Sequence, residues 1–322
     1  MKNTVRLLPN CFLVGAPKAG TTAMVQYLAS HPAVFFSPVK EPHFFSHDFP
    51  AIRRYTSEAE YLDLFRDAAP AHRIRGEASV SYLFSKHAAR LLRAFNPDAR
   101  LLVMVRNPVD LVASQHSQLV FTGDETVTDF RSAWELQEAR AAGRQIPLRC
   151  RTPAFLQYRD VGALGCQLER LLEVWPADQV HITVFDDLRD RPDEAGRSLL
   201  AFLGLEPSPG VEFRVANPNK VPRSRLAAQL THLNLDRISP LLTRVKGILR
   251  LRRLGLRSRL RRWNRVEQAR PPLDPAFRAQ LTEEFVSDIR KLESLLQRGL
   301  SPCSSSSPSP PSSSSPLLPA LV

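Results

Sequence analysis

Short apolar runs alternate with longer amphipathic segments over the first two thirds of the chain. The apolar runs predict strands, at residues 11–14, 33–37, 100–106 and 179–185, and residues 75–82 (RGEASVSY) are interpreted as the end of a further strand with a loop. The run at 100–106 (RLLVMVR) is apolar between its two arginines, which is typical of a strand buried on both faces of a parallel sheet. The amphipathic segments predict helices, at residues 21–29, 55–68, 85–95, 109–120, 130–142, 163–175 and 193–203. This alternation predicts an α/β fold: a parallel, doubly wound sheet flanked by helices on both faces.

Length and composition limit the number of domains. A chain of 322 residues, 43% hydrophobic and 24% charged, is sufficient for one large α/β domain. We therefore expect a single domain over residues 1–300. From Ser301 onward, ten of the 22 residues are serine and six are proline. Such a segment has too little apolar surface to form a core, so we expect a disordered tail at 301–322.

Cysteine spacing and hydropathy indicate the compartment. The four cysteines show no paired spacing, which indicates neither a disulfide framework nor a zinc site. No apolar run reaches the ~18 residues that a membrane-spanning helix needs. The first strand is expected within about ten residues of the N-terminus, which leaves no room for a signal peptide. We therefore expect a cytoplasmic protein with reduced thiols.

Basic residues are concentrated in one stretch. The formal net charge is +12, and eleven Lys or Arg residues lie between Asp236 and Glu267 without a single acid. Without these eleven residues the net charge falls to +1, so the chain as a whole shows no preference for nucleic acid. Apolar residues separate the arginines of segment 237–265, so the segment is interpreted as a helix that covers the domain. Peripheral contact with a membrane surface, or a patch for an anionic substrate or nucleic acid, are the alternatives.

Residues 10–22 (NCFLVGAPKAGTT) join an apolar run to a helix through a turn of small residues. Free N–H groups and the positive end of a helix dipole bind anions at such a joint, and a lysine neutralises phosphate. In the nucleoside-triphosphate P-loop, a lysine directly follows the second glycine. Here Gly15 and Gly20 keep the spacing, but Thr21 follows Gly20 and the lysine is Lys18. The sequence therefore predicts a phosphate site of another kind, with an ordinary strand–turn–helix joint as the alternative.

This loop resembles the PKxGTT loop of sulfotransferases, which use 3′-phosphoadenosine 5′-phosphosulfate (PAPS) as donor. The resemblance implies that the 5′-phosphosulfate is bound by Lys18, Ala19, Gly20, Thr21 and Thr22. In the family the lysine stabilises charge on the bridging oxygen, and the reaction requires no metal ion. The resemblance covers residues 10–300 and also implies a fold similar to P-loop nucleoside-triphosphate hydrolases.

A second motif lies at the expected end of the strand at 100–106. Arg106-Asn107-Pro108, with Ser114 six residues after the proline, is similar to the R-x-P-x(5)-S signature of sulfotransferases. In that family the arginine and the serine bind the 3′-phosphate, and a guanidinium offers a two-pronged contact to a dianion. Residues 216–224 resemble the basic loop that closes over the donor. The resemblance therefore adds Lys220 and Arg223 as further 3′-phosphate ligands.

The segment 40–45 (KEPHFF) resembles the KExxFF block of bacterial and heparan sulfate-like carbohydrate sulfotransferases. There the glutamate removes a proton from the acceptor hydroxyl as that oxygen attacks sulfur, which implies Glu41 as the catalytic base. His43 is the alternative base, or an orienting partner. Residues 76–82 resemble the GExxPxY segment of the same family and make Glu77 a second acid.

Together these motifs imply a PAPS-dependent sulfotransferase with a hydroxyl- or amine-bearing acceptor, such as a carbohydrate, a lipid or a small metabolite. Adenosine 3′,5′-bisphosphate is then the second product. A P-loop kinase or nucleotide hydrolase is one alternative, against which the displaced lysine and the absence of a convincing acidic metal ligand count. A non-catalytic protein bound to membrane surfaces through residues 237–265 is the other.

Overall fold

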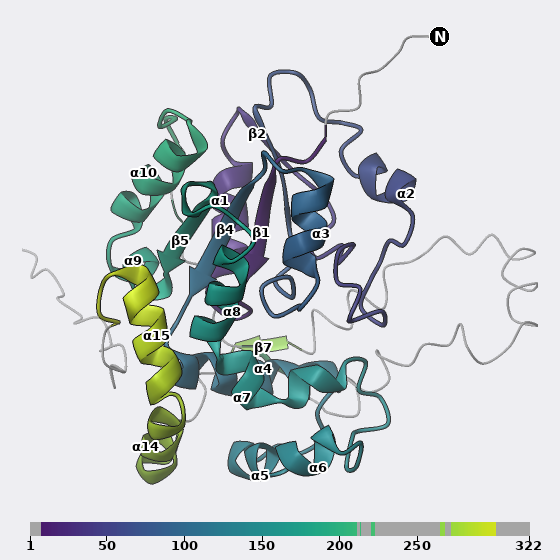
Figure 1. Ribbon diagram of the computed structural model, residues 1–322, viewed down its shortest axis with the longest axis vertical. Coiled ribbons are helices and arrows are strands. Elements are labelled where there is room, and N and C mark those ends of the chain that lie inside the picture. The colour runs from purple at the N-terminus through teal and green to yellow at the C-terminus, as the bar shows by residue number, and fades with distance from the viewer. Residues whose placement is uncertain (1–7, 211–212, 214–219, 223–264, 268–271, 301–322) are drawn as a thin grey trace, which may run out of the picture.

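A five-stranded parallel sheet forms the centre of the molecule. The computed structural model describes residues 8–210, 213, 220–222, 265–267 and 272–300. The sheet contains β1 (Cys11–Gly15), β2 (Val34–Phe36), β3 (Ile74–Ala78), β4 (Arg100–Val105) and β5 (Val180–Val184). The strand order is β2-β3-β1-β4-β5, and all neighbours are parallel (Figure 1). The predicted parallel α/β sheet is therefore confirmed, with β1 in its middle.

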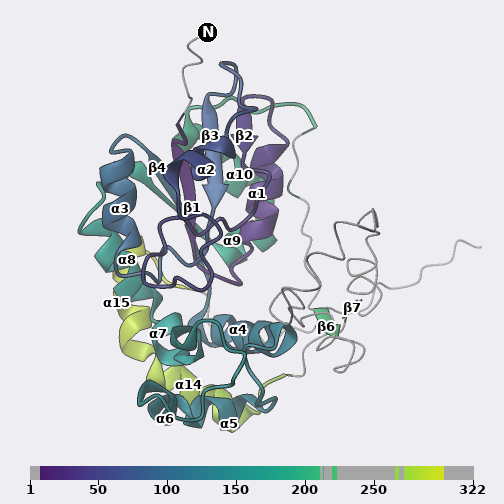
Figure 2. The same ribbon diagram turned by 90° about the vertical axis from the view of Figure 1, so that its right-hand side faces the viewer.

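Helices cover both faces of this sheet. Figure 2 shows α3 and α8 on one side of the strands and α1 and α10 on the other. The described helices are α1 (Thr21–Ala29), α2 (Glu58–Asp63), α3 (Ala88–Phe95), α4 (Pro108–Thr122), α5 (Phe130–Glu135), α6 (Gln137–Ala141), α7 (Tyr158–Gly162), α8 (Leu164–Leu172), α9 (Phe185–Asp190), α10 (Pro192–Leu203), α14 (Pro275–Glu284) and α15 (Val286–Leu296). Short 3-10 turns lie at Pro153–Leu156 and Ala177–Gln179, and β6 (Lys220–Pro222) pairs antiparallel with β7 (Arg265–Glu267).

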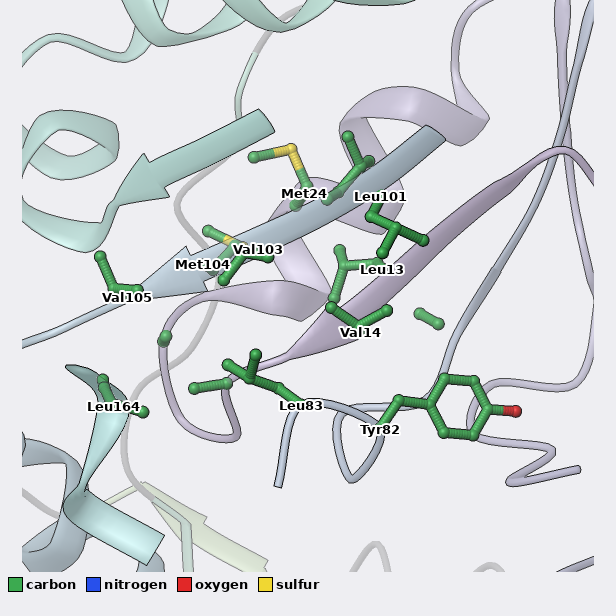
Figure 3. Close-up of a cluster of buried hydrophobic side chains, with 14 of the residues drawn as sticks. Leu13, Val14, Met24, Tyr82, Leu83, Leu101, Val103, Met104, Val105 and Leu164 are labelled. Atoms are coloured by element: carbon green, nitrogen blue, oxygen red, sulfur yellow. The ribbon is translucent and has the colours of Figure 1, made fainter. Parts of the chain in front are cut away.

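The hydrophobic core is built around β1 and β4. The side chains of both strands are buried except that of Arg100. Figure 3 shows Met24 of α1 on one side of these strands and Leu83 and Leu164 on the other. Each buried side chain of this size contributes about 1.5–3 kcal/mol through removal of apolar surface from water. This packing fixes the carboxyl ends of β1 and β4, and the loops that follow them, as neighbours.

Several helical segments differ from the prediction. The helix expected at 130–142 is two helices that break at Leu136, where the side-chain amide of Gln137 donates to the carbonyl of Trp134 at 2.8 Å. The helix expected at 55–68 is limited to α2. Helices α7, α9, α14 and α15 were not predicted.

Some predictions fall outside the described residues. These are the structure of most of the basic segment 237–265, the position of Arg223 and the state of the tail at 301–322. Among the helices that the structure does describe, none has the length and apolar character needed to cross a membrane.

Candidate functional site

The loop between β1 and α1 forms an anion cradle. Gly20 precedes α1 with φ 86°, no side chain caps this helix end, and its first turn contains no acidic residue. The first N–H groups of a helix have no acceptor within the helix and carry partial positive charge, so they favour an anion. A Cβ atom at Gly20 would lie 3.0 Å from the Phe185 ring, so a side chain at this position requires both a strained backbone and a shift of that ring. The local geometry therefore suits a phosphate or sulfate group.

The arginine that follows β4 lies beside this loop. A guanidinium N–H of Arg106 donates to the carbonyl oxygen of Lys18 at 3.2 Å, although the two residues are 88 positions apart. The guanidinium carbon also lies 4.5 Å from the centre of the Phe185 ring. Parallel neighbours end at the same edge of a sheet, which explains why the loops after β1 and β4 meet. The two phosphate motifs thus share one location.

A cavity of about 760 Å³ lies at this edge of the sheet. Its walls include most of the residues that the sequence motifs single out: Lys18, Gly20, Thr21, Thr22, Glu41, His43, Arg106 and Ser114. Ala19 is fully buried and is not among the lining residues. Lys220 lies in β6, but its side chain is outside what the structure describes, as is Arg223. The structure therefore brings eight predicted site residues to one cavity.

The loop between β2 and α2 presents two side chains of opposite character to the cavity. Glu41 and His43 both have left-handed backbones, with φ 59° and 53°. Non-glycine residues adopt this conformation at a cost of about 1–3 kcal/mol, and such residues cluster at functional sites. The Glu41 N–H donates to the carbonyl of Ala78 at 2.8 Å, and the His43 N–H donates to the hydroxyl of Ser79 at 3.0 Å. The residues that follow β3 therefore hold the loop in place.

Two basic side chains lie beside the Glu41 carboxylate. Its oxygens lie 3.6 Å from Nε2 of His43 and 3.8 Å from Nζ of Lys40. Burial raises the pKa of Glu41, but the hydrogen bond from His43 and the charge of Lys40 outweigh this effect and lower it overall. Lys40 also donates to the hydroxyl of Thr22 at 2.6 Å, which links this loop to α1. Glu41 is therefore ionised at neutral pH.

The other predicted acid lies behind the cavity wall. Glu77 is fully buried and accepts hydrogen bonds from Tyr82 at 2.7 Å, Ser79 at 2.9 Å and Tyr61 at 3.4 Å. Burial raises the pKa of its carboxyl group to about 7, although the three hydroxyl donors oppose that shift. Glu77 is not among the residues that line the cavity. Its position corrects the prediction of a second acid at the site and makes it a support for the loop.

Several contacts between lining residues from separate segments carry no local sequence signal. Lys18 donates from Nζ to the amide oxygen of Gln118 at 3.2 Å. Asp124 accepts two hydrogen bonds from the Arg151 guanidinium, at 3.0 and 2.7 Å, across 27 positions of the chain. The Ser81 hydroxyl lies 2.8 Å from Nδ1 of His43. These contacts join separate loops, and no motif within one stretch of sequence could have indicated them.

Comparisons with known proteins agree with this geometry. Residues 8–239 match the family described as "Sulfotransferase domain". Human carbohydrate sulfotransferase 15 is 33% identical over 258 residues, which is 63% of this chain and 45% of that protein. Human bifunctional heparan sulfate N-deacetylase/N-sulfotransferase 2 is 29% identical over 221 residues, which is 64% of this chain and 23% of that protein. The chain thus spans less than half the length of these curated relatives.

A solved structure covers more of the chain. The crystal structure of a sulfotransferase from Alicyclobacillus acidocaldarius is 29% identical in sequence and superimposes with a TM-score of 0.64. The match covers 91% of this chain and 98% of that one. Its fold therefore corresponds to nearly all of the sheet and the helices described above.

Proposed function

Because the chain belongs to the sulfotransferase domain family, we propose that it transfers a sulfuryl group from PAPS to a hydroxyl group of an acceptor. The observation that carries this proposal is the contact between Arg106 and Lys18, which joins the two phosphate motifs at the cavity. A donor with phosphate groups at both its 5′ and 3′ positions needs two anion sites. The cradle before α1 and Arg106 are the proposed sites for these two groups.

The residues present fit such a donor. The uncapped N-terminus of α1, with Lys18 and the two threonines that follow Gly20, suits the 5′-phosphosulfate. Arg106 and the buried Ser114 of α4 suit the 3′-phosphate, because a guanidinium and a hydroxyl together provide several directed donors. When bound, PAPS supplies an activated sulfuryl group and a stable leaving group. Lys18 would stabilise the charge that develops as this group departs.

Glu41 is the proposed general base. It is ionised, it lines the same cavity as the phosphate cradle, and a carboxylate can remove the proton of an acceptor hydroxyl. His43 would orient the carboxylate across their 3.6 Å separation, and Ser81 would fix the imidazole through its 2.8 Å contact with Nδ1. His43 is the alternative base, since its ring also faces the cavity.

The melting temperature in the presence of nucleotides tests the donor. Adenosine 3′,5′-bisphosphate at ~100 times its dissociation constant should stabilise the native state by roughly 2.7 kcal/mol, whereas ADP and ATP, with or without Mg²⁺, should have smaller effects. Arg106→Ala should abolish the difference between the bisphosphate and ADP. Arg66→Ala, which changes an exposed arginine away from the cavity, is the matched control.

Two other outcomes of this experiment would contradict parts of the proposal. Stabilisation by Mg²⁺-ATP alone would contradict the proposed donor and favour a P-loop kinase or nucleotide hydrolase. Stabilisation by the bisphosphate that survives in Arg106→Ala would retain the donor but contradict the assigned 3′-phosphate ligand.

A further inference from the structure

The cavity extends beyond the residues assigned to the donor, and its remaining wall indicates the acceptor. We propose that the acceptor is an aryl alcohol, whose flat apolar ring packs against Phe84 and Phe155 and whose hydroxyl is presented to Glu41. This inference rests on the proposed sulfotransferase activity and goes beyond it. It also departs from the carbohydrate acceptors named for the curated relatives.

An aromatic cluster of three rings forms this wall. Phe84 and Phe155 line the cavity, with their ring centres 5.9 Å apart. Phe49 is buried behind them, stacked on Phe84 at 5.6 Å and 9° and 5.2 Å from Phe155. The guanidinium of Arg170 holds the adjoining backbone by donating to the carbonyl of Phe84 at 3.2 Å. The two exposed ring faces are therefore supported from behind and need little ordering when a planar ligand binds.

Apolar side chains continue from the aromatic cluster. Ile52, Val80 and Phe121 line the same cavity and are each only partly buried. A ring that displaces water from this surface gains the free energy of apolar burial without losing a hydrogen bond. The lining as a whole is mixed, since Arg54, Gln115 and Gln118 also contribute to it, but its aromatic side offers the apolar surface on which small ligands with flat rings bind.

The polar groups next to this wall are already bonded to one another. The Ser81 hydroxyl lies between Nδ1 of His43 at 2.8 Å and the Ser46 hydroxyl at 2.7 Å. Both carboxylate oxygens of Asp124 accept from Arg151, and one also accepts from Thr122 at 2.7 Å. The charge of Arg151 is thereby neutralised at the cavity wall.

A multiply hydroxylated sugar would fit this surface poorly. Each sugar hydroxyl taken from water needs a new partner, and a hydroxyl left without one opposes binding. In the part of the chain that the structure describes, one buried side-chain hydroxyl of the lining, that of Thr152, has no partner. That oxygen is itself enclosed by protein atoms, so it adds no partner for a sugar hydroxyl in the cavity.

Binding to the bisphosphate-loaded protein tests the acceptor without requiring turnover. Calorimetric titration of the full chain with 2-naphthol and with methyl β-glucoside, both at saturating adenosine 3′,5′-bisphosphate, should give at least tenfold tighter binding of 2-naphthol. Phe155→Ala should weaken the binding of 2-naphthol by about tenfold, because an aromatic contact is lost. The same substitution should leave the binding of the bisphosphate unchanged. Leu148→Ala removes a fully exposed apolar side chain outside the cavity and should change neither affinity.

The two levels of the proposal can fail separately. If the bisphosphate itself does not bind, the sulfotransferase activity is contradicted, and the acceptor assignment with it. If the bisphosphate binds but methyl β-glucoside binds as tightly as 2-naphthol, or 2-naphthol does not bind, only the aryl alcohol is overturned. Unchanged 2-naphthol affinity in Phe155→Ala would overturn the aromatic wall as its site.

Discussion

The hydroxyl of Ser79 accepts a hydrogen bond from the backbone N–H of His43 at 3.0 Å. The same hydroxyl donates to the buried carboxylate of Glu77 at 2.9 Å. Tyr82 donates to Glu77 at 2.7 Å, and its oxygen accepts from the N–H of Phe45 at 3.3 Å. One carboxylate behind the cavity therefore anchors, through two hydroxyls, the loop that carries the proposed base.

The pKa of Glu77 makes the stability of this anchor depend on pH. Burial raises that pKa from 4.5 to about 7, so the folded state retains a proton that the unfolded state releases between these values. The free energy of unfolding should then fall as pH rises from about 4.5 to 7, by about 3 kcal/mol for this group, and become level above that range. The side chain of Glu77→Gln does not titrate, so the unfolding free energy of this variant should lack this pH-dependent contribution.

Urea unfolding at several pH values measures the effect. The difference in unfolding free energy between the wild type and Glu77→Gln should decrease as pH rises through this window. Glu135→Gln changes an exposed carboxylate on α5 and should follow the wild-type pH dependence. Parallel curves for the wild type and Glu77→Gln would show that Glu77 has an ordinary pKa in the folded protein.

Replacement of Glu41 should affect the rate rather than donor binding. Glu41→Gln keeps the shape of the side chain but cannot accept a proton, so kcat should fall by about 10²–10⁴. Because surrounding positive charge, opposed by burial, lowers the pKa of Glu41, the acidic limb of the kcat/KM profile should lie below pH 4.5. Binding of adenosine 3′,5′-bisphosphate should be retained.

His43→Gln separates the two candidate bases. If His43 only orients Glu41, its replacement should lower kcat by about tenfold or less and move the acidic limb upward, because the hydrogen bond that lowers the pKa of Glu41 is lost. A loss of kcat in His43→Gln as large as that in Glu41→Gln would instead indicate the imidazole as base.

The sequence predicted those parts of the fold that depend on local patterns, and it missed those that depend on contacts between distant segments. Apolar runs such as 100–106 predicted four strands of the central sheet to within a few residues, because burial on both faces leaves little room for polar side chains. Strand β3 contains Arg75 and Glu77, and only its approximate position was predicted. The break at Leu136 was not predicted, because it depends on a tertiary setting that amphipathic periodicity does not report. Helices α14 and α15 pack against distant elements and were missed for the same reason.

The same distinction applies to the cavity. The cradle and Arg106 lie within short motifs, so their residue types and spacing could be recognised. The Asp124–Arg151 pair and the aromatic cluster join separate segments, and nothing in any one segment indicates that they meet. Fold topology alone brings Phe49, Phe84 and Phe155 together.

Glycine at position 20 should be required for both stability and donor binding. Gly20→Ala forces a Cβ into a backbone with φ 86° and places it 3.0 Å from Phe185, whose ring lies under the Arg106 guanidinium. The strained backbone should cost about 1 kcal/mol of stability and the close contact about 1–3 kcal/mol more. Displacement of Phe185 should also weaken binding of adenosine 3′,5′-bisphosphate.

Gly123 offers a matched comparison for this substitution. It has a similar φ of 80°, but a Cβ at this position would meet nothing within 4 Å. Gly123→Ala should therefore show only the backbone cost in urea unfolding and leave bisphosphate binding unchanged. Equal losses of stability in the two variants would mean that the contact with Phe185 has no energetic effect.

The neighbouring acids that follow α4 should differ sharply in their contributions to stability. Glu125 and Arg140 form an ion pair with both side chains buried and contacts of 2.7 and 2.8 Å, and Tyr158 adds a hydrogen bond at 2.9 Å. Glu125→Gln leaves the Arg140 charge buried without a counterion, which should cost about 3–5 kcal/mol. Arg151 is 58% exposed, so water compensates for a lost partner, and Asp124→Asn should cost only about 1–2 kcal/mol.

The pH dependence of Glu125→Gln identifies the charge as the cause. Burial raises the pKa of Glu125, but the hydrogen bonds from Arg140 and the backbone outweigh it, so the pKa lies below 4.5 in the folded state. The stabilisation is therefore complete above pH 4.5 and is lost as pH falls through the lower folded value. In urea unfolding the gap between the wild type and Glu125→Gln should be constant from pH 6 to 8 and narrow in acid. If the difference in unfolding free energy stays equally large in acid, the lower stability of Glu125→Gln is caused by packing and not by the ion pair.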